Sequence, residues 1–348
     1  MFDNIKLNRR SLLAGTVLAA GLVGLPALAT AQSGELNLYS SRHYDTDEAL
    51  YADFTEKTGI KINRIEAGAD ELIERMISEG ANSPADVLIT VDAGRLERAD
   101  EAGLLQPVAS EGLAVRVPGY LQDPENKWFG FSKRARVIMY ACDRVENPPQ
   151  TYEALADEEW KGRLLIRSST NIYNQSLVGS ILAEAGEEAT EAWARGIVAN
   201  LARDPRGGDT DQIRAVAAGE GDIAVSNTYY LGNLIRSENA EDRAVAEQIC
   251  VVFPNQDGRG THVNISGGGV AANAPNPEAA KAFLEYLASD SAQQYFAEGN
   301  SEYPVVEGVA APEWIQKLGE FKEDNLSAET FAKNNGEALM VTDRAGWK

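Results

Sequence analysis

The feature that most constrains the fold of this chain is a regular alternation of short apolar segments with longer amphipathic ones. From residue 35 the apolar segments read ELNLYS, KINRIEA and ADVLITVD, and the amphipathic segments between them read DEALYADFTEKTG and DELIERMISEG. The first kind is typical of β-strands and the second of α-helices. Strands that are separated by helices pair in parallel, because the crossover helix returns the chain to the same edge of the sheet. The pattern therefore predicts a mainly parallel sheet flanked by helices.

A second α/β series follows the first, which indicates two lobes. It contains the strand GRLLIRS, the helix NQSLVGSILAEAG and the strand DIAVS. We interpret two other apolar segments, RARVIMYA and ICVVFP, as strands that cross between the lobes. Lobe 1 is assigned to residues 32–130 and 255–305, and lobe 2 to residues 131–254 and 306–348. Such lobes form a cleft, and α/β sheets bind ligands at the carboxyl ends of their strands.

The first 31 residues are interpreted as a signal peptide and are left out of the fold. Lys6, Arg9 and Arg10 precede the apolar run SLLAGTVLAAGLVGLPALA, and the run ends in an A-x-A cleavage pattern at residues 29–31. Basic residues, a short apolar run and a small-residue cleavage site are typical of exported proteins. The arginine pair is compatible with both the Sec and the Tat route. An uncleaved membrane anchor is the alternative interpretation of the same run.

Charge and cysteine content narrow the classes of partner and cofactor. The chain has a formal net charge of −21, so nucleic acid and anionic membrane surfaces would repel it. Its two cysteines, Cys142 and Cys250, are compatible with one disulfide or with two buried thiols. The sequence has no CxxC motif and no Cys/His cluster, which argues against a zinc or iron–sulfur site.

Aromatic side chains with polar atoms follow three of the predicted strands, each just before a helix. His43 and Tyr44 follow the first strand, Tyr173 follows GRLLI, and Tyr229 and Tyr230 follow DIAVSNT. An isolated tyrosine pair at the start of a helix is often a packing feature. Three such positions at strand ends are a pattern, and we expect these rings to line one cleft.

Phenol groups in such a cleft are suited to binding Fe³⁺. A hard, highly charged cation prefers anionic oxygen ligands, and a phenolate is one once its proton is lost. The ordinary pKa of tyrosine is near 10, so the metal has to drive the ionisation. Helix N-termini favour the negative charge, and Arg42, Arg134 and Arg136 are candidate neighbouring cations.

Five segments carry a resemblance to a known family: YSSRHYDTD, SPADVLITVDAGRL, FSKRARVIMY, RSSTNIYNQSL and SNTYYLG. They resemble segments of the periplasmic ferric-ion-binding proteins, which are the solute-binding subunits of iron ABC transporters. The resemblance spans nearly all of the mature chain, and it implies a two-lobed periplasmic-binding-protein fold of the type II kind. It implies that Tyr229 and Tyr230 are paired phenolate ligands, with Tyr173 as a third, Tyr44 as a fourth and His43 as a candidate imidazole ligand.

One departure from the family places this chain in a tyrosine-rich branch. Some members use a Glu after the SPADV strand together with a bound anion, whereas this chain has Val91 and Asp92 there. The resemblance then implies an iron site with little or no help from phosphate or carbonate. Four phenolates leave a negative cluster, so Arg134 is the preferred counter-charge outside the ligand set, with Arg42 beside it.

The resemblance also implies a monomeric periplasmic protein that delivers Fe³⁺ to a membrane permease, with Fe²⁺ open as the alternative cargo. Enzyme motifs such as G-x-S-x-G or a P-loop are absent from the sequence, so we expect no catalytic activity. The alternative function is the binding of a small organic solute, such as a polyamine, thiamine or an organic anion, by a protein of the same fold.

Overall fold

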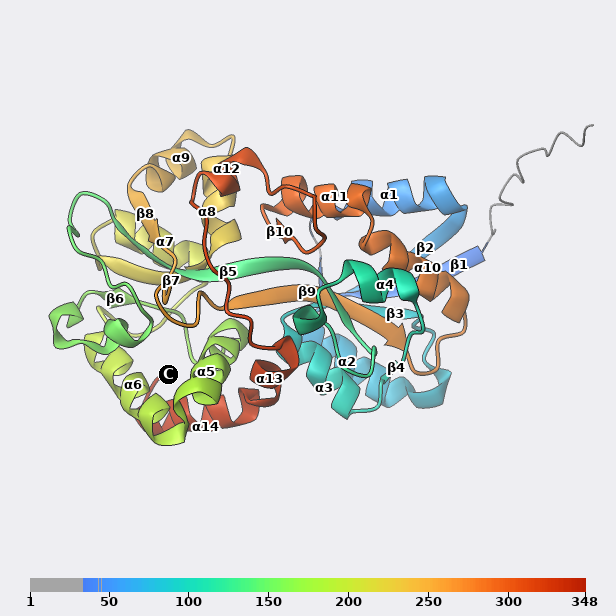
Figure 1. The fold of residues 1–348 in the computed structure, drawn as a ribbon, viewed down its shortest axis with the longest axis horizontal. Helices are drawn as coiled ribbons and strands as arrows, with labels where there is room; N and C mark the ends of the chain where they lie inside the picture. Colours follow the sequence, from blue (N-terminus) through green and yellow to red (C-terminus); the bar gives the residue numbers. More distant parts are fainter. Residues whose placement is uncertain (1–33, 43, 45) are drawn as a thin grey trace, which may run out of the picture. The chain divides into compact units, whose positions relative to one another are not determined.

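The first half of the chain folds into the alternating elements that its periodicity predicts. The protein is described by a computed structural model over residues 34–42, 44 and 46–348, so the predicted signal peptide and His43 lie outside the described residues (Figure 1). In chain order the elements up to residue 141 are β1 (Gly34–Ser40), α1 (Asp47–Thr58), β2 (Ile60–Glu66), α2 (Ala69–Glu79), η1 (Gly80–Asn82), β3 (Val87–Val91), α3 (Ala93–Glu101), β4 (Leu105–Gln106), α4 (Glu111–Arg116), η2 (Gly119–Leu121) and β5 (Phe129–Ala141).

The second half continues the α/β alternation and ends in helices. Its elements are η3 (Glu153–Ala156), η4 (Glu158–Trp160), β6 (Leu164–Leu165), α5 (Ile172–Ala185), α6 (Glu187–Asn200), α7 (Asp209–Ala217), β7 (Ile223–Asn227), α8 (Thr228–Ile235), α9 (Ala240–Ala246), β8 (Ile249–Val252), β9 (Val263–Ala271), α10 (Pro277–Leu287), α11 (Asp290–Asn300), β10 (Tyr303–Pro304), α12 (Glu313–Gln316), α13 (Ala328–Lys333) and α14 (Asn335–Ala345). Among the described residues, no helix is both long enough and apolar enough to cross a bilayer.

The strands form two groups that share β5. The first group has the order β2-β1-β3-β9, with β4 on β9 and β10 on β5, and the second group contains β7, β6 and β8. The first part of β5 pairs with β9, while its second part pairs with β7 on one side and β8 on the other. Figure 1 shows β5 as the long green strand beside β9. The predicted α/β fold with crossing strands is confirmed, and the lobe boundaries stay a prediction.

Two details of the predicted sheets are wrong. The sheets are mixed rather than mainly parallel, because β5 and β9 run antiparallel to all the strands with which they pair. The segment ICVVFP forms β8, which pairs with the second part of β5 alone, and β9 is the other strand at the junction. The glycines of β9 permit close backbone approach: a Cβ at Gly267 would clash with the carbonyl oxygen of Phe129.

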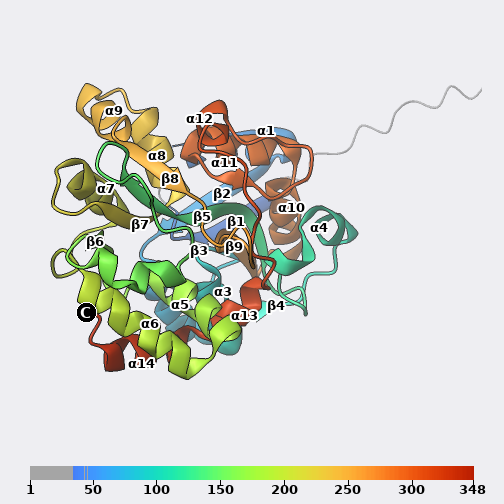
Figure 2. The same cartoon turned by 60° about the vertical axis from the view of Figure 1, so that its left-hand side comes forward.

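The buried apolar side chains form separate hydrophobic cores on the two strand groups. One hydrophobic core is built from residues 36–131 and 265–332, and two others cover the second strand group with residues 135–263 and 338–347. The C-terminal tail contributes to both sides, since Phe331 of α13 belongs to the first core and Val341 of α14 to the second. In both views α14 lies against α5 and α6 (Figures 1 and 2).

The structure settles the state of the two cysteines, since Cys142 and Cys250 form a disulfide. Cys142 directly follows β5, and Cys250 lies on β8, which pairs antiparallel with β5 at Ala141 and Ile249. The pairing brings their Cα atoms to 5.2 Å although 108 positions separate them in the chain. The bond therefore fixes β8 to the end of the shared strand.

Replacing both cysteines by serine is expected to lower the free energy of unfolding by about 2–5 kcal/mol, because the unfolded chain loses a long covalent loop. Urea unfolding of Cys142→Ser/Cys250→Ser beside the oxidised wild type measures this difference. A change below about 0.5 kcal/mol would contradict the structural role of the bond.

Candidate metal centre

Two of the predicted strand-end positions lie together because their strands are parallel neighbours. β6 pairs with β7, with Leu164 opposite Ile223, so the chain leaves both strands at the same edge. α5 follows β6 after a short turn, and α8 follows β7 directly. The N-termini of α5 and α8 are thus brought to one place, as parallel pairing requires.

Three tyrosines occupy the first turns of these two helices. Tyr173 is held by the side chain of Asn171, whose Oδ1 accepts the Tyr173 backbone N–H at 3.1 Å. Tyr229 and Tyr230 are the second and third residues of α8, and their ring centroids lie 4.1 Å apart. The hydroxyl oxygens of Tyr173 and Tyr229 are separated by 3.5 Å. Three phenol groups therefore meet at the two helix N-termini.

Tyr44 reaches this cluster from the first strand group. It follows β1, and the Arg42 guanidinium lies 5.0 Å from the centroid of its ring. Burial raises the pKa of Tyr44 to about 12, and the Glu302 carboxylate adds to the effect while Arg42 opposes it. Tyr44 in turn contributes to the raised pKa of Tyr229, so the two phenols are close enough to interact electrostatically.

Tyr44, Tyr229 and Tyr230 are held in their neutral form in the absence of a metal. Burial is the main cause of the raised pKa of Tyr229, and Tyr173 and Tyr230 are the next contributors. Burial also raises the pKa of Tyr230, and Tyr173 is again the next contributor. Anions that are close together in a poorly solvated site repel one another, so ionisation of several phenols requires a cation between them.

Arg134 supplies positive charge next to the phenols. Its side chain is 1 % exposed, and its guanidinium lies 5.4 Å from the ring centroid of Tyr173. One nitrogen donates to Ser266 at 2.9 Å, whereas Nε and Nη2 have no hydrogen-bond partner within the described part of the chain. A buried guanidinium with two unpartnered nitrogens favours a neighbour that becomes an anion.

Arg42, in contrast, already forms ion pairs with two carboxylates. Its Nε donates to Asp47 and its Nη1 to Glu302, both at 3.0 Å. Glu302 also lies 3.8 Å from Arg134, so one carboxylate serves both arginines. The charge of Arg42 is thus largely balanced before any phenol ionises. Glu302 follows α11, and no local pattern in the sequence indicated its role.

Arg167, which the sequence did not single out, is a second arginine next to the phenols. The guanidinium of Arg167 is 5.4 Å from the ring centroid of Tyr173, and its charge lowers the pKa of Tyr230 against the effect of burial. Its position directly after the GRLLI strand is the sequence signal that could have identified it.

Asp209 fixes the residues that precede α8, because its fully buried carboxylate accepts hydrogen bonds from Arg136 Nη1 and from the Asn227 N–H, each at 3.0 Å. Arg136, a sequence candidate, is therefore an anchor for the start of α8.

Asp92 lies after the SPADV strand, where some members of the ferric-ion-binding family have a glutamate ligand and this chain has none. Both carboxylate oxygens are occupied: Oδ1 accepts from Ser176 at 2.7 Å and from the Gly94 N–H at 2.9 Å, and Oδ2 accepts from Asn264 at 2.8 Å. Its φ of 81° is strained for a residue other than glycine. Asp92 therefore connects the end of β3 with α5 on the other strand group.

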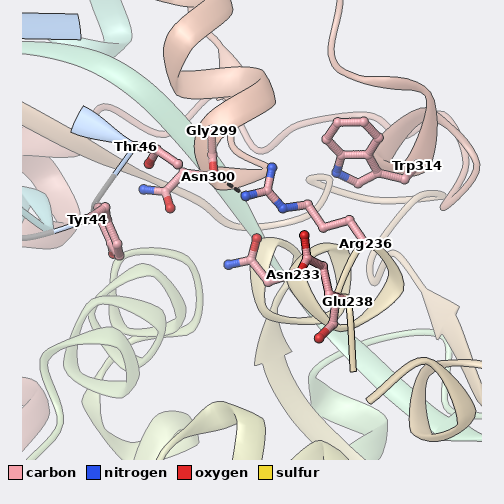
Figure 3. A pocket seen from close by; sticks show the side chains of 9 residues that line it. Tyr44, Thr46, Asn233, Arg236, Glu238, Gly299, Asn300 and Trp314 are labelled. Atoms are coloured by element: carbon pink, nitrogen blue, oxygen red, sulfur yellow. Dashed lines mark hydrogen bonds between the residues drawn. The ribbon is translucent and has the colours of Figure 1, made fainter. Parts of the chain in front are cut away.

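A cavity of about 730 Å³ lies beside the cluster. Of the predicted site residues that the structure describes, only Tyr44 lines it (Figure 3). On the far wall Arg236 donates to the Gly299 carbonyl at 2.7 Å, and its guanidinium lies 5.8 Å from the ring centroid of Trp314. The structure thus brings together Tyr44, Tyr173, Tyr229 and Tyr230 with Arg42 and Arg134, next to a space open to a small molecule. His43 lies outside the described residues.

The chain matches one protein family over most of its length. The profile of the bacterial extracellular solute-binding proteins covers residues 49–323. Among curated proteins, the chain is 56 % identical to iron uptake protein A1 of Synechocystis sp., covering 90 % of this chain and 88 % of that protein. It is 51 % identical to iron uptake protein A2 of the same organism over 99 % of both chains.

Solved structures of similar proteins have the same fold as this chain. The Trichodesmium protein IdiA (FutA), solved in complex with iron and citrate ligands, is 58 % identical and superposes with a TM-score of 0.88, covering 90 % of this chain and all of that one. Apo FutA2 from Synechocystis is 52 % identical with a TM-score of 0.86, covering 91 % of this chain and all of that one.

The raised pKa values predict how the stability of the iron-free protein changes in alkali. Above pH of about 10 the unfolded chain loses its phenol protons first, so the free energy of unfolding falls as the pH rises toward the folded-state values. We expect Tyr229→Phe/Tyr230→Phe to lose less stability than the wild type between pH 9 and pH 11, by roughly 1 kcal/mol per removed phenol. Urea unfolding at each pH measures the slopes.

The matched control is Tyr295→Phe on α11, which removes a hydroxyl outside the cluster. It measures what the loss of one tyrosine hydroxyl elsewhere does to the stability. Equal slopes for the double variant and the wild type would contradict the raised pKa of the two phenols of α8.

Proposed function

The chain belongs to the bacterial extracellular solute-binding proteins, and we propose that it captures Fe³⁺ in the periplasm and delivers it to an ABC transporter permease. The observation that supports this most is the meeting of three phenol groups at two helix N-termini, with the Tyr173 and Tyr229 hydroxyls 3.5 Å apart. The names of its relatives, iron uptake proteins and an iron complex, point to the same cargo. The role is binding and release rather than catalysis.

The ligand set follows from the chemistry of the cluster. Tyr173, Tyr229 and Tyr230 are the proposed phenolate ligands from α5 and α8, and Tyr44 is a fourth from the first strand group. Fe³⁺ favours anionic oxygen and provides the charge that neutral, buried phenols need in order to lose their protons. His43 is the proposed fifth ligand, since it precedes Tyr44 directly.

The surroundings of the cluster compensate its charge. Four phenolates around one trivalent ion leave one negative charge, and Arg134, next to Tyr173, has two nitrogens without a hydrogen-bond partner among the described residues. The guanidinium of Arg167 lies 5.4 Å from the centroid of the same ring. The first turn of α5 adds a smaller favourable contribution to anions. A synergistic anion is therefore not needed for charge balance.

Because the proposed ligands come from both strand groups, the site can capture and release iron. Tyr44 comes from the first strand group and the other three from the second, so the ion would stabilise the arrangement in which both groups meet around it. The Asp92 to Ser176 hydrogen bond joins the same two sides. Opening of this arrangement, or reduction to Fe²⁺, weakens phenolate bonding and frees the ion for the permease.

Removing one phenol oxygen from α8 should abolish tight iron binding without unfolding the protein. We expect Tyr229→Phe and Tyr230→Phe each to weaken Fe³⁺ binding by at least about 100-fold, since even outer-shell changes at metal sites cost 10–100-fold. Titration of the mature protein with ferric citrate should give a visible phenolate-to-iron charge-transfer band, which is lost or shifted in the variants. Circular dichroism checks the fold.

Tyr295→Phe is again the control and should keep the band and the affinity. If the wild type shows no band and instead binds thiamine, a polyamine or an organic anion, the protein is an organic-solute binder of the same fold. Wild-type affinity in both α8 variants would refute the ligand assignment while leaving iron as the cargo.

Iron binding should release protons, because Tyr44, Tyr229 and Tyr230 carry them in the metal-free protein. We expect about one proton per phenolate ligand, so that affinity falls as the pH is lowered. Calorimetry in two buffers with different ionisation enthalpies counts the protons. Tyr230→Phe should release about one fewer than the wild type; an unchanged count would exclude Tyr230 from the ligand set.

A further inference from the structure

A second group of charged side chains lies outside the tyrosine cluster. Glu97 and Asp100 on α3 and Asp123 after η2 each place a carboxylate oxygen within 4.8 Å of the other two. Glu97 and Asp123 are buried and Asp100 is half-buried. None of the three contributes to the phenol site described above.

The local structure explains why these oxygens converge. Glu97 and Asp100 are three residues apart on one helix, so they share a face. Asp123 is oriented by its own turn, in which Oδ2 accepts the backbone N–H groups of Glu125 at 2.8 Å and Lys127 at 3.0 Å. The turn therefore holds the Asp123 carboxylate rigidly against the helix.

One member of the group lacks the partner that its burial requires. Glu97 is only 4 % exposed, and its Oε2 has no hydrogen-bond partner among the described residues. Its nearest cation is the Nζ of Lys333, 3.7 Å from the other oxygen, Oε1. A buried carboxylate oxygen without a partner is costly, which points to a bound group at this position.

The two nearby lysines do not neutralise the group. Lys127 bonds Asp100 at 2.9 Å but also the exposed Glu125 at 2.7 Å. Lys333 forms its shorter bond with Glu329. Each lysine is thus shared with a carboxylate outside the three, and negative charge remains in excess.

We propose that Glu97, Asp100 and Asp123 form a binding site for Ca²⁺. Hard divalent cations prefer carboxylate oxygens, and Ca²⁺ accepts six to eight of them at 2.3–2.6 Å in a flexible geometry. Mg²⁺ requires a near-ideal octahedron at about 2.1 Å. Three carboxylates that converge from a helix and a turn suit the ion that tolerates irregular geometry, with water completing its coordination.

A bound Ca²⁺ would connect two parts of the first core, because it would join α3 to the turn at Asp123. Lys333 of α13 is repelled by the ion and keeps its ion pair with Glu329. α13 packs against both α3 and α5, so a more stable α3 would support the C-terminal tail through packing. The effect of Ca²⁺ is on stability, because ions that bind only the folded state raise the midpoint of thermal unfolding.

The test uses the mature protein freed of iron and calcium, at pH 8. This lies above the pKa of Glu97, which burial raises to about 7 although Lys333 opposes the shift. Calorimetric titration with CaCl₂ should give one site with a Kd on the order of 10⁻⁴ M, and the melting temperature should rise with Ca²⁺. Glu97→Gln and Asp123→Asn should each bind Ca²⁺ at least about tenfold more weakly.

Two controls separate this site from other carboxylates and from the phenols. Glu101→Gln changes an exposed carboxylate at the end of the same helix and should bind Ca²⁺ like the wild type. Tyr229→Phe should also keep Ca²⁺ binding, whatever its effect on iron. Glu97→Gln should fold at least as well as the wild type without Ca²⁺, because it removes a repelling charge.

Three results would overturn the proposal. They are an absence of Ca²⁺ binding to the wild type at millimolar concentration, unchanged binding in Glu97→Gln and Asp123→Asn, and tighter binding of Mg²⁺ than of Ca²⁺. In the first case, a melting temperature that rises only as the pH is lowered through the pKa of Glu97 would show that a proton occupies the position.

Discussion

The pairing of β5 with strands of both groups is the constraint on which the rest of the structure depends. This strand of 13 residues forms hydrogen bonds with β9 along its first part and with β7 and β8 along its second. A slip of one residue would turn each side chain to the other face, so the register of both groups is fixed together. The disulfide at the end of β5 and the close approach of β9 at Gly267 support the same junction.

Around this junction the structure buries charge in a way that favours anions at one place. Asp47 and Glu302 both pair with Arg42 at 3.0 Å, whereas Arg134 lies 3.8 Å from Glu302 and keeps two nitrogens without a hydrogen-bond partner among the described residues. Tyr229 and Tyr230 are neutral without a metal because burial opposes their ionisation. A cation of high charge changes that balance, since it attracts the phenolates and leaves Arg134 a partner.

The side-chain hydrogen bond between Asp92 and Ser176 is a polar contact between the two strand groups, whereas the core on each side contains many apolar side chains. Asp92 holds a strained φ of 81° and reaches Ser176 on α5, and the tail links the two sides between α13 and α14. A few hydrogen bonds between the groups can be replaced by hydrogen bonds to water at a low cost in free energy. The close-packed apolar cores are expected to stay intact when the groups move. This division of interactions suits a protein that has to hold an ion and then release it.

The sequence by itself determined the α/β class, the positions of most helices and strands, and the strand-end tyrosines, because periodicity and helix entry are local properties of the chain. It also placed Arg134 beside the cluster. Only the tertiary structure decided the antiparallel role of β9, the Cys142–Cys250 bond, and the places of Glu302, Arg167 and Asp209. These depend on contacts between residues far apart in the chain. No local pattern encodes such pairs, because the backbone must first fold before their side chains meet.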